Sequence, residues 1–222
     1  MKWQRIAVTA ALALLGVTVG SLAFAQAKKP AVGAGTASTA GPAAAAGAVN
    51  YGERFGTVCA ACHGANGRSD MPGTPILAGQ HSFYAITQLF LFREGRRHNE
   101  AMIALAKPMT DTDLRGFADF IGTLPPAPAP APATPPDAAR MVKGQALAHE
   151  HKCTFCHGAN LDGGQQVPRI GGQKEDYLLA SLQGFKANTR PGYTRAMSEA
   201  LSQVPEADLD LLAYYVANFK SK

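Results

Sequence analysis

Apolar residues recur at a helical spacing in four short segments of the chain. In residues 83–93 they stand at Phe83, Ile86, Leu89 and Phe90, which places them on one face of an amphipathic helix. The same spacing recurs in residues 110–121, 177–186 and 205–219. Thr110 or Asp111 is predicted to cap the first of these helices, and Pro205 is predicted to lie in the first turn of the last. No segment alternates as a half-buried strand does. The pattern predicts an all-α fold in which the aromatic residues form the core.

The four helices belong to two copies of one module. Matching residues follow each other in the same order in both copies: residues 75–80 with 168–173, Tyr84 with Tyr177, Phe92 with Phe185, and Ala101-Met102 with Ala196-Met197. Such agreement along a whole module indicates duplication, so one fold is used twice. Each copy is predicted to run helix, cysteine motif, loop, helix, methionine loop, helix.

Two segments of biased composition flank the first module, and the second of them separates it from the other module. Residues 26–50 are rich in Ala and Gly and predict a flexible leader. Residues 125–136 alternate Pro with Ala, which excludes a regular helix and predicts an extended, semi-rigid spacer. The predicted domains are therefore residues 51–124 and 137–222. Each is short for a free-standing apolar core.

The first 25 residues resemble a signal for export. Lys2 and Arg5 precede an apolar run that ends in the small residues Ala23 and Ala25. This order predicts a signal peptide, cleaved on export to the periplasm. The alternative is an uncleaved anchor, because the run is about as long as the shortest spanning helices. Membrane contact is otherwise expected only through partners.

Charge excludes one class of partner. The chain has a formal net charge of +5, part of which lies in the signal and leader. Residues 51–124 carry seven basic and seven acidic side chains, and residues 137–222 carry ten and nine. Neither module is a basic platform, so no nucleic-acid binding is expected.

All four cysteines occur in two Cys-x-x-Cys-His motifs: Cys59, Cys62 and His63, then Cys153, Cys156 and His157. This spacing is typical of covalent haem c attachment, with the histidine as an iron ligand. A zinc site, a redox dithiol or two disulfides are the alternatives. None of them requires a histidine after each pair, so the motifs predict two haem c groups. Pro75 and Pro168 follow the two motifs either as simple turn prolines or, in a pattern that resembles class I cytochromes c, as the source of a carbonyl that orients each histidine.

A sixth iron ligand is predicted from the repeat. After His157 the second module offers only Met197, and Met197 aligns with Met102. A thioether favours Fe(II), so a Met/His pair raises the potential relative to two histidines. Met71 has no counterpart, and Met109 aligns with Val204. The alternative is that Met102 is a core residue and His98 binds the iron; the remaining histidines, His81, His149 and His151, are interpreted as surface residues.

On these motifs the chain resembles dihaem class I cytochromes c of the cytochrome c4 type. Further support comes from Phe92-Arg93-Glu94-Gly95-Arg96-Arg97 and from the terminal Leu211–Tyr215 segment. The resemblance implies two tandem class I cytochrome c domains, with three to four helices each around a haem, joined by the Pro/Ala linker. It also implies domains packed about a pseudo-twofold axis with their haem propionates close together.

The same resemblance implies a periplasmic electron carrier rather than an enzyme. Its expected partners are a donor dehydrogenase or cytochrome complex and an acceptor such as a terminal oxidase. One alternative is a haem-carrying subunit of a flavin- or quinone-dependent dehydrogenase. A dihaem enzyme, such as a thiosulfate dehydrogenase, is a third possibility. That enzyme would need an open coordination position on one iron or a ligand that can be displaced, and the paired methionines argue against it.

Overall fold

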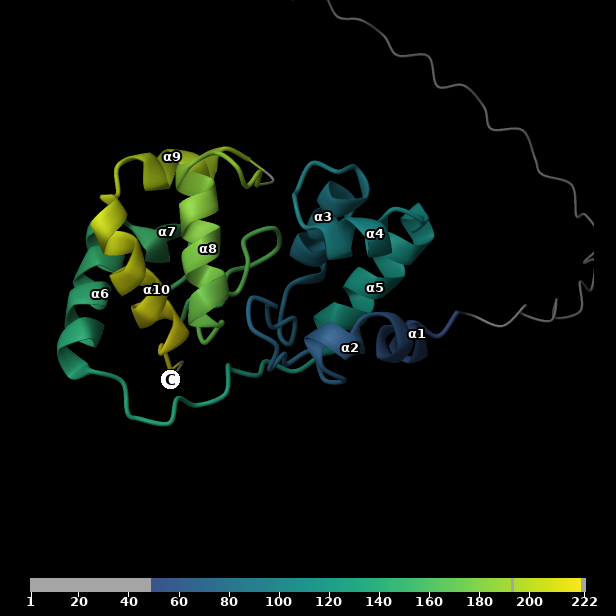
Figure 1. Ribbon diagram of the computed structural model, residues 1–222, viewed down its shortest axis with the longest axis horizontal. Coiled ribbons are helices and arrows are strands. Elements are labelled where there is room, and N and C mark those ends of the chain that lie inside the picture. The colour runs from purple at the N-terminus through teal and green to yellow at the C-terminus, as the bar shows by residue number, and fades with distance from the viewer. Residues whose placement is uncertain (1–48, 193, 221–222) are drawn as a thin grey trace, which may run out of the picture. The chain divides into compact units, whose positions relative to one another are not determined.

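The computed structural model describes residues 49–192 and 194–220 as helices joined by loops, with no β-strand in these ranges (Figure 1). The predicted signal and nearly all of the predicted leader lie outside the described residues. The described residues all belong to one compact unit. None of the helices described is both long enough and apolar enough to cross a bilayer.

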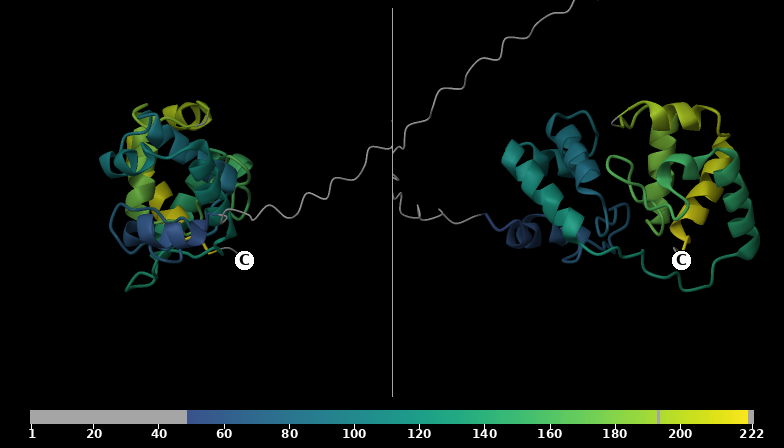
Figure 2. Two further views of the ribbon diagram at one scale, coloured as in Figure 1. Left: turned by 90° about the vertical axis from the view of Figure 1, so that its right-hand side faces the viewer. Right: turned by 180° about the vertical axis from the view of Figure 1, so that it is seen from behind.

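The two repeats fold into matching sets of helices. The first repeat contains α1 (Tyr51–Val58), α2 (Ala60–His63), α3 (Ser82–Arg93), α4 (Glu100–Ala106) and α5 (Asp111–Thr123). The second contains α6 (Ala138–Glu150), α7 (Cys153–His157), α8 (Glu175–Lys186), α9 (Ala196–Ser202), a 3-10 turn (Glu206–Asp208) and α10 (Leu209–Ala217). In each repeat the last helix packs against the first and against the long middle helix, as Figures 1 and 2 show for α10 with α6 and α8. The all-α prediction is confirmed.

The predicted helices begin close to their expected starts. Thr110 caps α5: its hydroxyl accepts the backbone N–H of Asp113, whose carboxylate accepts the backbone N–H of Thr110 in return. This reciprocal pair is a capping box, which satisfies two amides that the helix leaves without partners. Pro205 precedes the 3-10 turn that leads into α10.

The expectation of a methionine loop is wrong, because both segments are short helices. Met102 lies in α4 and Met197 in α9. The sequence of α4 is rich in alanine and other strong helix formers, and Asn99 caps it by accepting the Met102 N–H at 2.9 Å. The cysteine motifs are helical turns as well, which adds short helices to the three expected in each repeat.

The crossing of α6 and α10 is very close and depends on a glycine. A Cβ atom at Gly144 would lie 2.4 Å from the Cβ of Tyr215 and 2.6 Å from the carbonyl oxygen of Leu211. Gly116 allows a similar approach in the first repeat, where the Tyr51 ring would lie 2.1 Å from an added Cβ. In each repeat the backbone of one end helix therefore packs directly against a tyrosine of the other end helix, and a methyl group on the glycine would not fit between them.

The Pro/Ala segment is held against both repeats. Residues 125–136 contain no helix or strand, as predicted for alternating Pro and Ala. Pro126 packs on Gly79 so closely that a Cβ there would lie 2.6 Å from the Pro126 Cα. The Pro128 carbonyl accepts the Arg68 Nε–H at 2.9 Å, and the Ala129 N–H donates to the carbonyl of Gly172 at 2.7 Å. The spacer is thus extended and is fixed by contacts at several points.

Candidate functional site

Each cysteine motif forms one helical turn that presents both thiols together. In the first repeat the His63 N–H donates to the Cys59 carbonyl at 2.9 Å, which closes the turn. Cys59 and Cys62 are three residues apart, so they lie on the same side of the turn. Cys59 and Cys153 are half-buried, while Cys62 and Cys156 are exposed. One turn therefore offers two thiols to one edge of a planar group.

The structure gives no support to the zinc or disulfide alternatives. All four cysteines are unpaired. No group of three or more His, Cys, Asp or Glu side chains in the described ranges could hold a metal ion, so the two pairs do not converge.

The two motif histidines have the same buried geometry. His63 and His157 are 6% and 5% exposed. The Nδ1 of His63 lies 2.9 Å from the carbonyl oxygen of Pro75, and the Nδ1 of His157 lies 3.0 Å from that of Pro168. A carbonyl oxygen only accepts, so Nδ1 carries the proton and Nε2 keeps its lone pair. Each ring is fixed in the tautomer that an iron ligand needs.

Burial also keeps these rings neutral. It lowers the pKa of both His63 and His157, and the hydrogen bond to the proline carbonyl opposes that effect. The positive charge of Arg97 lowers the pKa of His63 further. Arg97 thus lies close enough to His63 to act on it electrostatically.

The two aligned methionines lie against the cores that hold the first cysteine of each motif. Met102 packs on a cluster formed by Leu89, Leu114 and Phe117, which Cys59 also contacts. Met197 packs on the core of the second repeat, as Cys153 does. Met109 touches the same first-repeat cluster, so packing alone does not separate it from Met102. Its counterpart Val204 is 1% exposed, which supports a core role for Met109.

The remaining candidates lie elsewhere. Met71 is 46% exposed, and its carbonyl accepts a hydrogen bond from Lys174. His98 and His149 are exposed, as predicted. The prediction of a surface role is wrong for His81 and His151, which are half-buried. Sequence reasoning missed His81 because its partner is a backbone carbonyl 81 positions away, that of Asp162, at 2.7 Å from Nε2.

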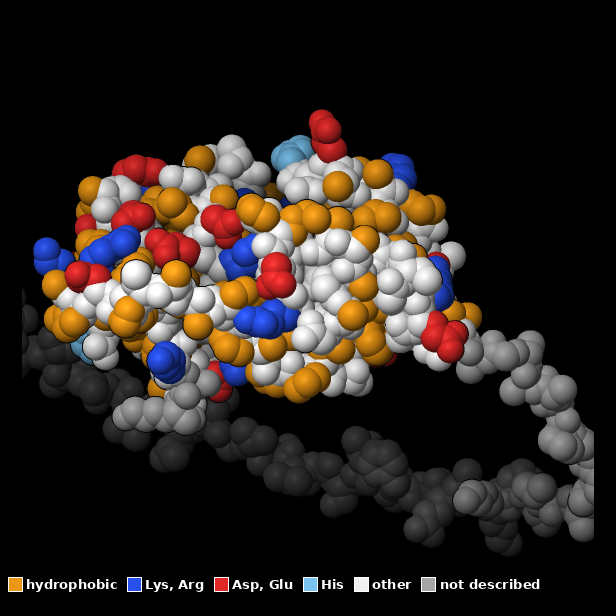
Figure 3. Space-filling model, turned by 60° about the horizontal axis from the view of Figure 1, so that its bottom comes forward, with side chains coloured by type: hydrophobic (Ala, Val, Ile, Leu, Met, Phe, Trp, Pro, Cys, Tyr) orange, Lys and Arg blue, Asp and Glu red, His pale blue; other side chains and the backbone are white. Residues whose placement is uncertain are grey.

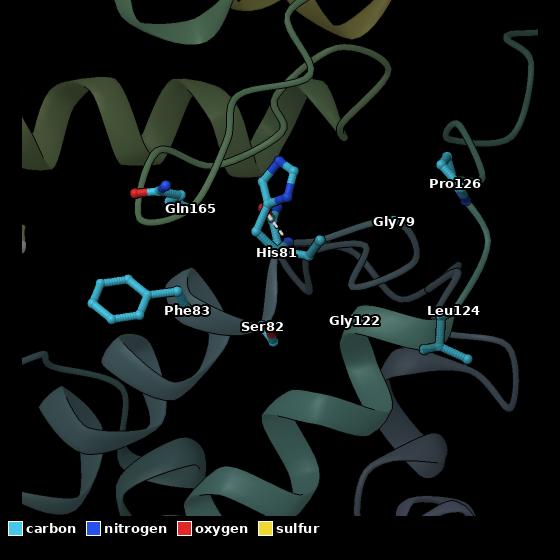
Figure 4. A pocket seen from close by; sticks show the side chains of 9 residues that line it. Gly79, His81, Ser82, Phe83, Gly122, Leu124, Pro126 and Gln165 are labelled. Atoms are coloured by element: carbon cyan, nitrogen blue, oxygen red, sulfur yellow. Dashed lines mark hydrogen bonds between the residues drawn. The ribbon is translucent and has the colours of Figure 1, made fainter.

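A shallow hollow beside His81 is not a cofactor site. Figure 4 shows the His81 ring between the Gly79 loop and the loop that carries Gln165. Ser82, Phe83 and the linker residue Pro126 are also among the lining residues. No cysteine or methionine lies among the lining residues. The hollow therefore lacks the thiols that attach a haem c and a methionine to pair with a histidine at its iron.

Four half-buried side chains form a cationic cluster, of which Arg97 acts electrostatically on the first histidine. The Arg97 guanidinium donates to the Tyr177 hydroxyl at 3.0 Å, and that of Arg190 donates to Tyr177 at 3.0 Å and to Tyr84 at 3.4 Å. Arg97 and Arg190 occupy matching positions of the repeat, five residues after Phe92 and Phe185 respectively. The contacts are thus exchanged between the repeats.

This cluster lacks negative charge in the protein itself. Neither arginine forms an ion pair with any acidic residue in the described ranges, and the Arg190 Nε is buried without a hydrogen-bond partner. Burial alone raises the pKa of Tyr177, but the charges and hydrogen bonds of the two guanidiniums lower it overall. Buried cations without counter-ions suit an anionic group. The motif histidines, the apolar clusters beside the first cysteines and the cation of Arg97 near His63 therefore fit an anionic haem.

Comparison with known proteins agrees with this geometry. The family model for cytochrome c matches residues 44–125 and again residues 141–220. The chain is 35% identical to cytochrome c4 of Thiocapsa roseopersicina, over 65% of this chain and 80% of that protein. It is 30% identical to a thiosulfate dehydrogenase electron acceptor of Thiomonas intermedia, over 72% of this chain and 77% of that protein.

A solved structure shares the arrangement of both repeats. The chain matches the crystal structure of reduced recombinant cytochrome c4 from Pseudomonas stutzeri with a TM-score of 0.68 and 26% identity. The match covers 77% of this chain and 97% of that chain. Two helical repeats, each with a haem motif and a preset histidine, define a dihaem electron-transfer protein. The chain belongs to the cytochrome c family, is of the cytochrome c4 type and carries two haem c groups.

Proposed function

We propose that one haem is attached through Cys59 and Cys62 and the other through Cys153 and Cys156. The axial pairs would be His63 with Met102 and His157 with Met197. The observation that carries this assignment is the matching Nδ1–H···O=C bond at Pro75 and Pro168, which leaves Nε2 free in both repeats. When bound, each haem supplies one-electron redox chemistry between Fe(II) and Fe(III).

The chain's own residues would hold each haem closed to substrates. A histidine on one side and a methionine on the other leave no open position, which suits an electron carrier rather than an enzyme. Arg97 and Arg190 would neutralise the propionates. The apolar walls would exclude water from the iron, and so raise its potential.

We infer that the protein transfers electrons in the periplasm, between a respiratory or dehydrogenase donor and an acceptor such as a terminal oxidase. The export pattern of residues 1–25 supports the location. The face in Figure 3 supports mixed contacts with the partners, because basic and acidic groups there are interspersed among apolar ones. Docking would accordingly show only modest salt dependence.

A second candidate donor is a thiosulfate dehydrogenase. The similarity to a thiosulfate dehydrogenase electron acceptor favours it. The further alternative, a subunit of a flavin- or quinone-dependent dehydrogenase, would be recognised by a partner that purifies with this chain in fixed stoichiometry.

Visible spectroscopy of paired methionine variants tests the ligand assignment. Sulfur ligation of ferric haem gives a weak band near the red edge of the spectrum, and wild type should show it for both haems. Met102→Ala should remove about half of this band and lower the potential of one haem, because a soft ligand to Fe(II) is lost. Met109→Leu is the matched control, since Met109 packs on the same cluster, and it should keep the full band. The reverse result would assign Met109 as the ligand, and an unchanged spectrum in both variants would refute methionine ligation in this repeat.

A further inference from the structure

Two glutamines at matching positions of the repeat each bind the backbone of the other repeat. The Gln173 side chain accepts the N–H of Ile76 through Oε1 and donates to the carbonyl of Ile76 through Nε2, both at 2.9 Å. Gln80 binds Arg169 in the same way, at 2.9 Å and 3.0 Å. Both glutamine side chains are buried, at 7% exposure. The contact is therefore reciprocal, and solvent has little access to replace it.

A second contact fixes which end of each amide faces the backbone. The Oε1 of Gln173 also accepts the N–H of Lys174 at 3.0 Å, and the Oε1 of Gln80 accepts the N–H of His81 at 3.3 Å. An amide oxygen has two lone pairs and accepts both N–H groups, whereas an amide nitrogen only donates. The oxygen of each glutamine thus faces the N–H of the opposite repeat.

The bound N–H belongs to the peptide group that orients the axial histidine. Pro75 C=O and Ile76 N–H are the two ends of one peptide unit. The carbonyl accepts from His63 Nδ1 at 2.9 Å, while the N–H donates to Gln173. Hydrogen bonds therefore run without a break from the glutamine of the second repeat to the histidine of the first.

The same connection exists in the other direction. The Pro168 carbonyl accepts from His157 Nδ1 at 3.0 Å, and the Arg169 N–H of that peptide unit donates to Gln80 at 2.9 Å. The path again begins in one repeat and ends at the histidine of the other. Duplication of the chain has thus produced two crossed paths.

We propose that Gln173 and Gln80 are positioning residues that tune the histidine ligand of the haem in the opposite repeat. Hydrogen bonds in series polarise each other. A peptide whose N–H is bound has a more negative carbonyl oxygen, which accepts more strongly from Nδ1–H. The imidazole then becomes a better electron donor and stabilises Fe(III). The proposal rests on the axial roles of His63 and His157 given above.

The test measures both reduction potentials in the full-length dihaem protein by spectroelectrochemical titration. Each haem is assigned from a reference variant in which its methionine is replaced by histidine. Gln173→Leu should raise the potential of the His63 haem and leave that of the His157 haem unchanged. Gln80→Leu should do the opposite, so each variant is the control for the other.

The expected shift is small but measurable. Serial polarisation changes a hydrogen bond by about 10–30%, which we expect to change the Fe(III)/Fe(II) ratio about twofold at a fixed applied potential. For one electron a tenfold ratio is 59 mV, so a twofold change is about 18 mV. Gln173→Glu keeps an oxygen that can accept the Ile76 N–H and should return the His63 haem to the wild-type potential or below.

The outcomes separate tuning from simple docking. A glutamine that only holds the repeats together would give equal shifts at both haems, or a similar effect for Leu and Glu. Either result overturns the proposal, as does a shift confined to the glutamine's own repeat or no shift at all. Failure of the histidine assignment is distinguished by His63→Ala and His157→Ala, which would then leave the low-spin visible spectrum of the haem in that repeat unchanged.

Discussion

Replacing Gly144 with alanine should destabilise the second repeat. The added Cβ would lie 2.4 Å from the Tyr215 Cβ and 2.6 Å from the Leu211 carbonyl oxygen. Neither atom can rotate away, because one is fixed to the backbone and the other is part of it. Helix α6 must therefore move away from α10 by about 1 Å to restore ordinary van der Waals separation.

The size of the effect follows from two opposing contributions. Overpacking of a tight contact costs about 1–3 kcal/mol, and the clash here involves backbone, so we take about 3 kcal/mol. Alanine gains about 1 kcal/mol over glycine in helix propensity. The net loss is about 2 kcal/mol, which lowers the melting temperature of a compact unit that contains both repeats by about 4–8 °C.

Thermal unfolding of the intact protein, followed by far-ultraviolet circular dichroism, measures this loss. Gly56→Ala is the control: Gly56 lies in α1, and no atom lies within 4 Å of an added Cβ. That variant should be neutral or more stable by about 1 kcal/mol. If Gly144→Ala is as stable as wild type, the close crossing of α6 and α10 is not a constraint and the packing argument fails.

Two further predictions concern charged groups. Hydrogen bonds from Arg54 and Thr110 hold the pKa of Asp113 below its ordinary value. The stability that this carboxylate contributes is therefore complete above the ordinary pKa of aspartate and is lost as the pH falls below it. Asp113→Asn should make the unfolding free energy less dependent on pH in the acid range. An unchanged pH dependence would exclude this role. Arg190→Gln removes a cation that we propose to neutralise a propionate and should lower at least one reduction potential, whereas a rise in both would contradict that proposal.

The elements of the fold were largely predictable, because they depend on local pattern and repetition. The spacing of Phe83, Ile86 and Leu89 predicts α3, and Thr110 marks the start of α5. Repetition then predicts the second copy of each helix. The motif cysteines and histidines are adjacent in sequence, so a single helical turn brings them together whatever the rest of the chain does. Their role as haem attachment and axial residues stays a prediction.

The contacts between the repeats could not be predicted in this way. Gln80 and Gln173 are visible as a repeated residue, but a repeat shows only that a position matters twice. It does not show that each side chain binds the other copy, at sequence separations of 89 residues for Gln80 and 97 residues for Gln173. Arg97 and Arg190 are similar: besides contacts within its own repeat, each donates to a tyrosine of the opposite repeat, Tyr177 and Tyr84 respectively, which local sequence does not reveal.

The length of the Pro/Ala segment gives no reason to expect separated repeats. Closing a longer loop costs little, about 0.6 kcal/mol for each doubling of its length. The buried glutamine contacts and the Arg–Tyr cluster oppose that cost, and contacts of Pro126 and Pro128 with Gly79 and Arg68 hold the linker itself. Both glutamine contacts use the loop whose proline carbonyl binds a motif histidine, so the proposed tuning of the haems depends on the same contacts that join the repeats. A mutation that opened the interface would therefore change both potentials, whereas loss of one glutamine would change only the haem opposite to it.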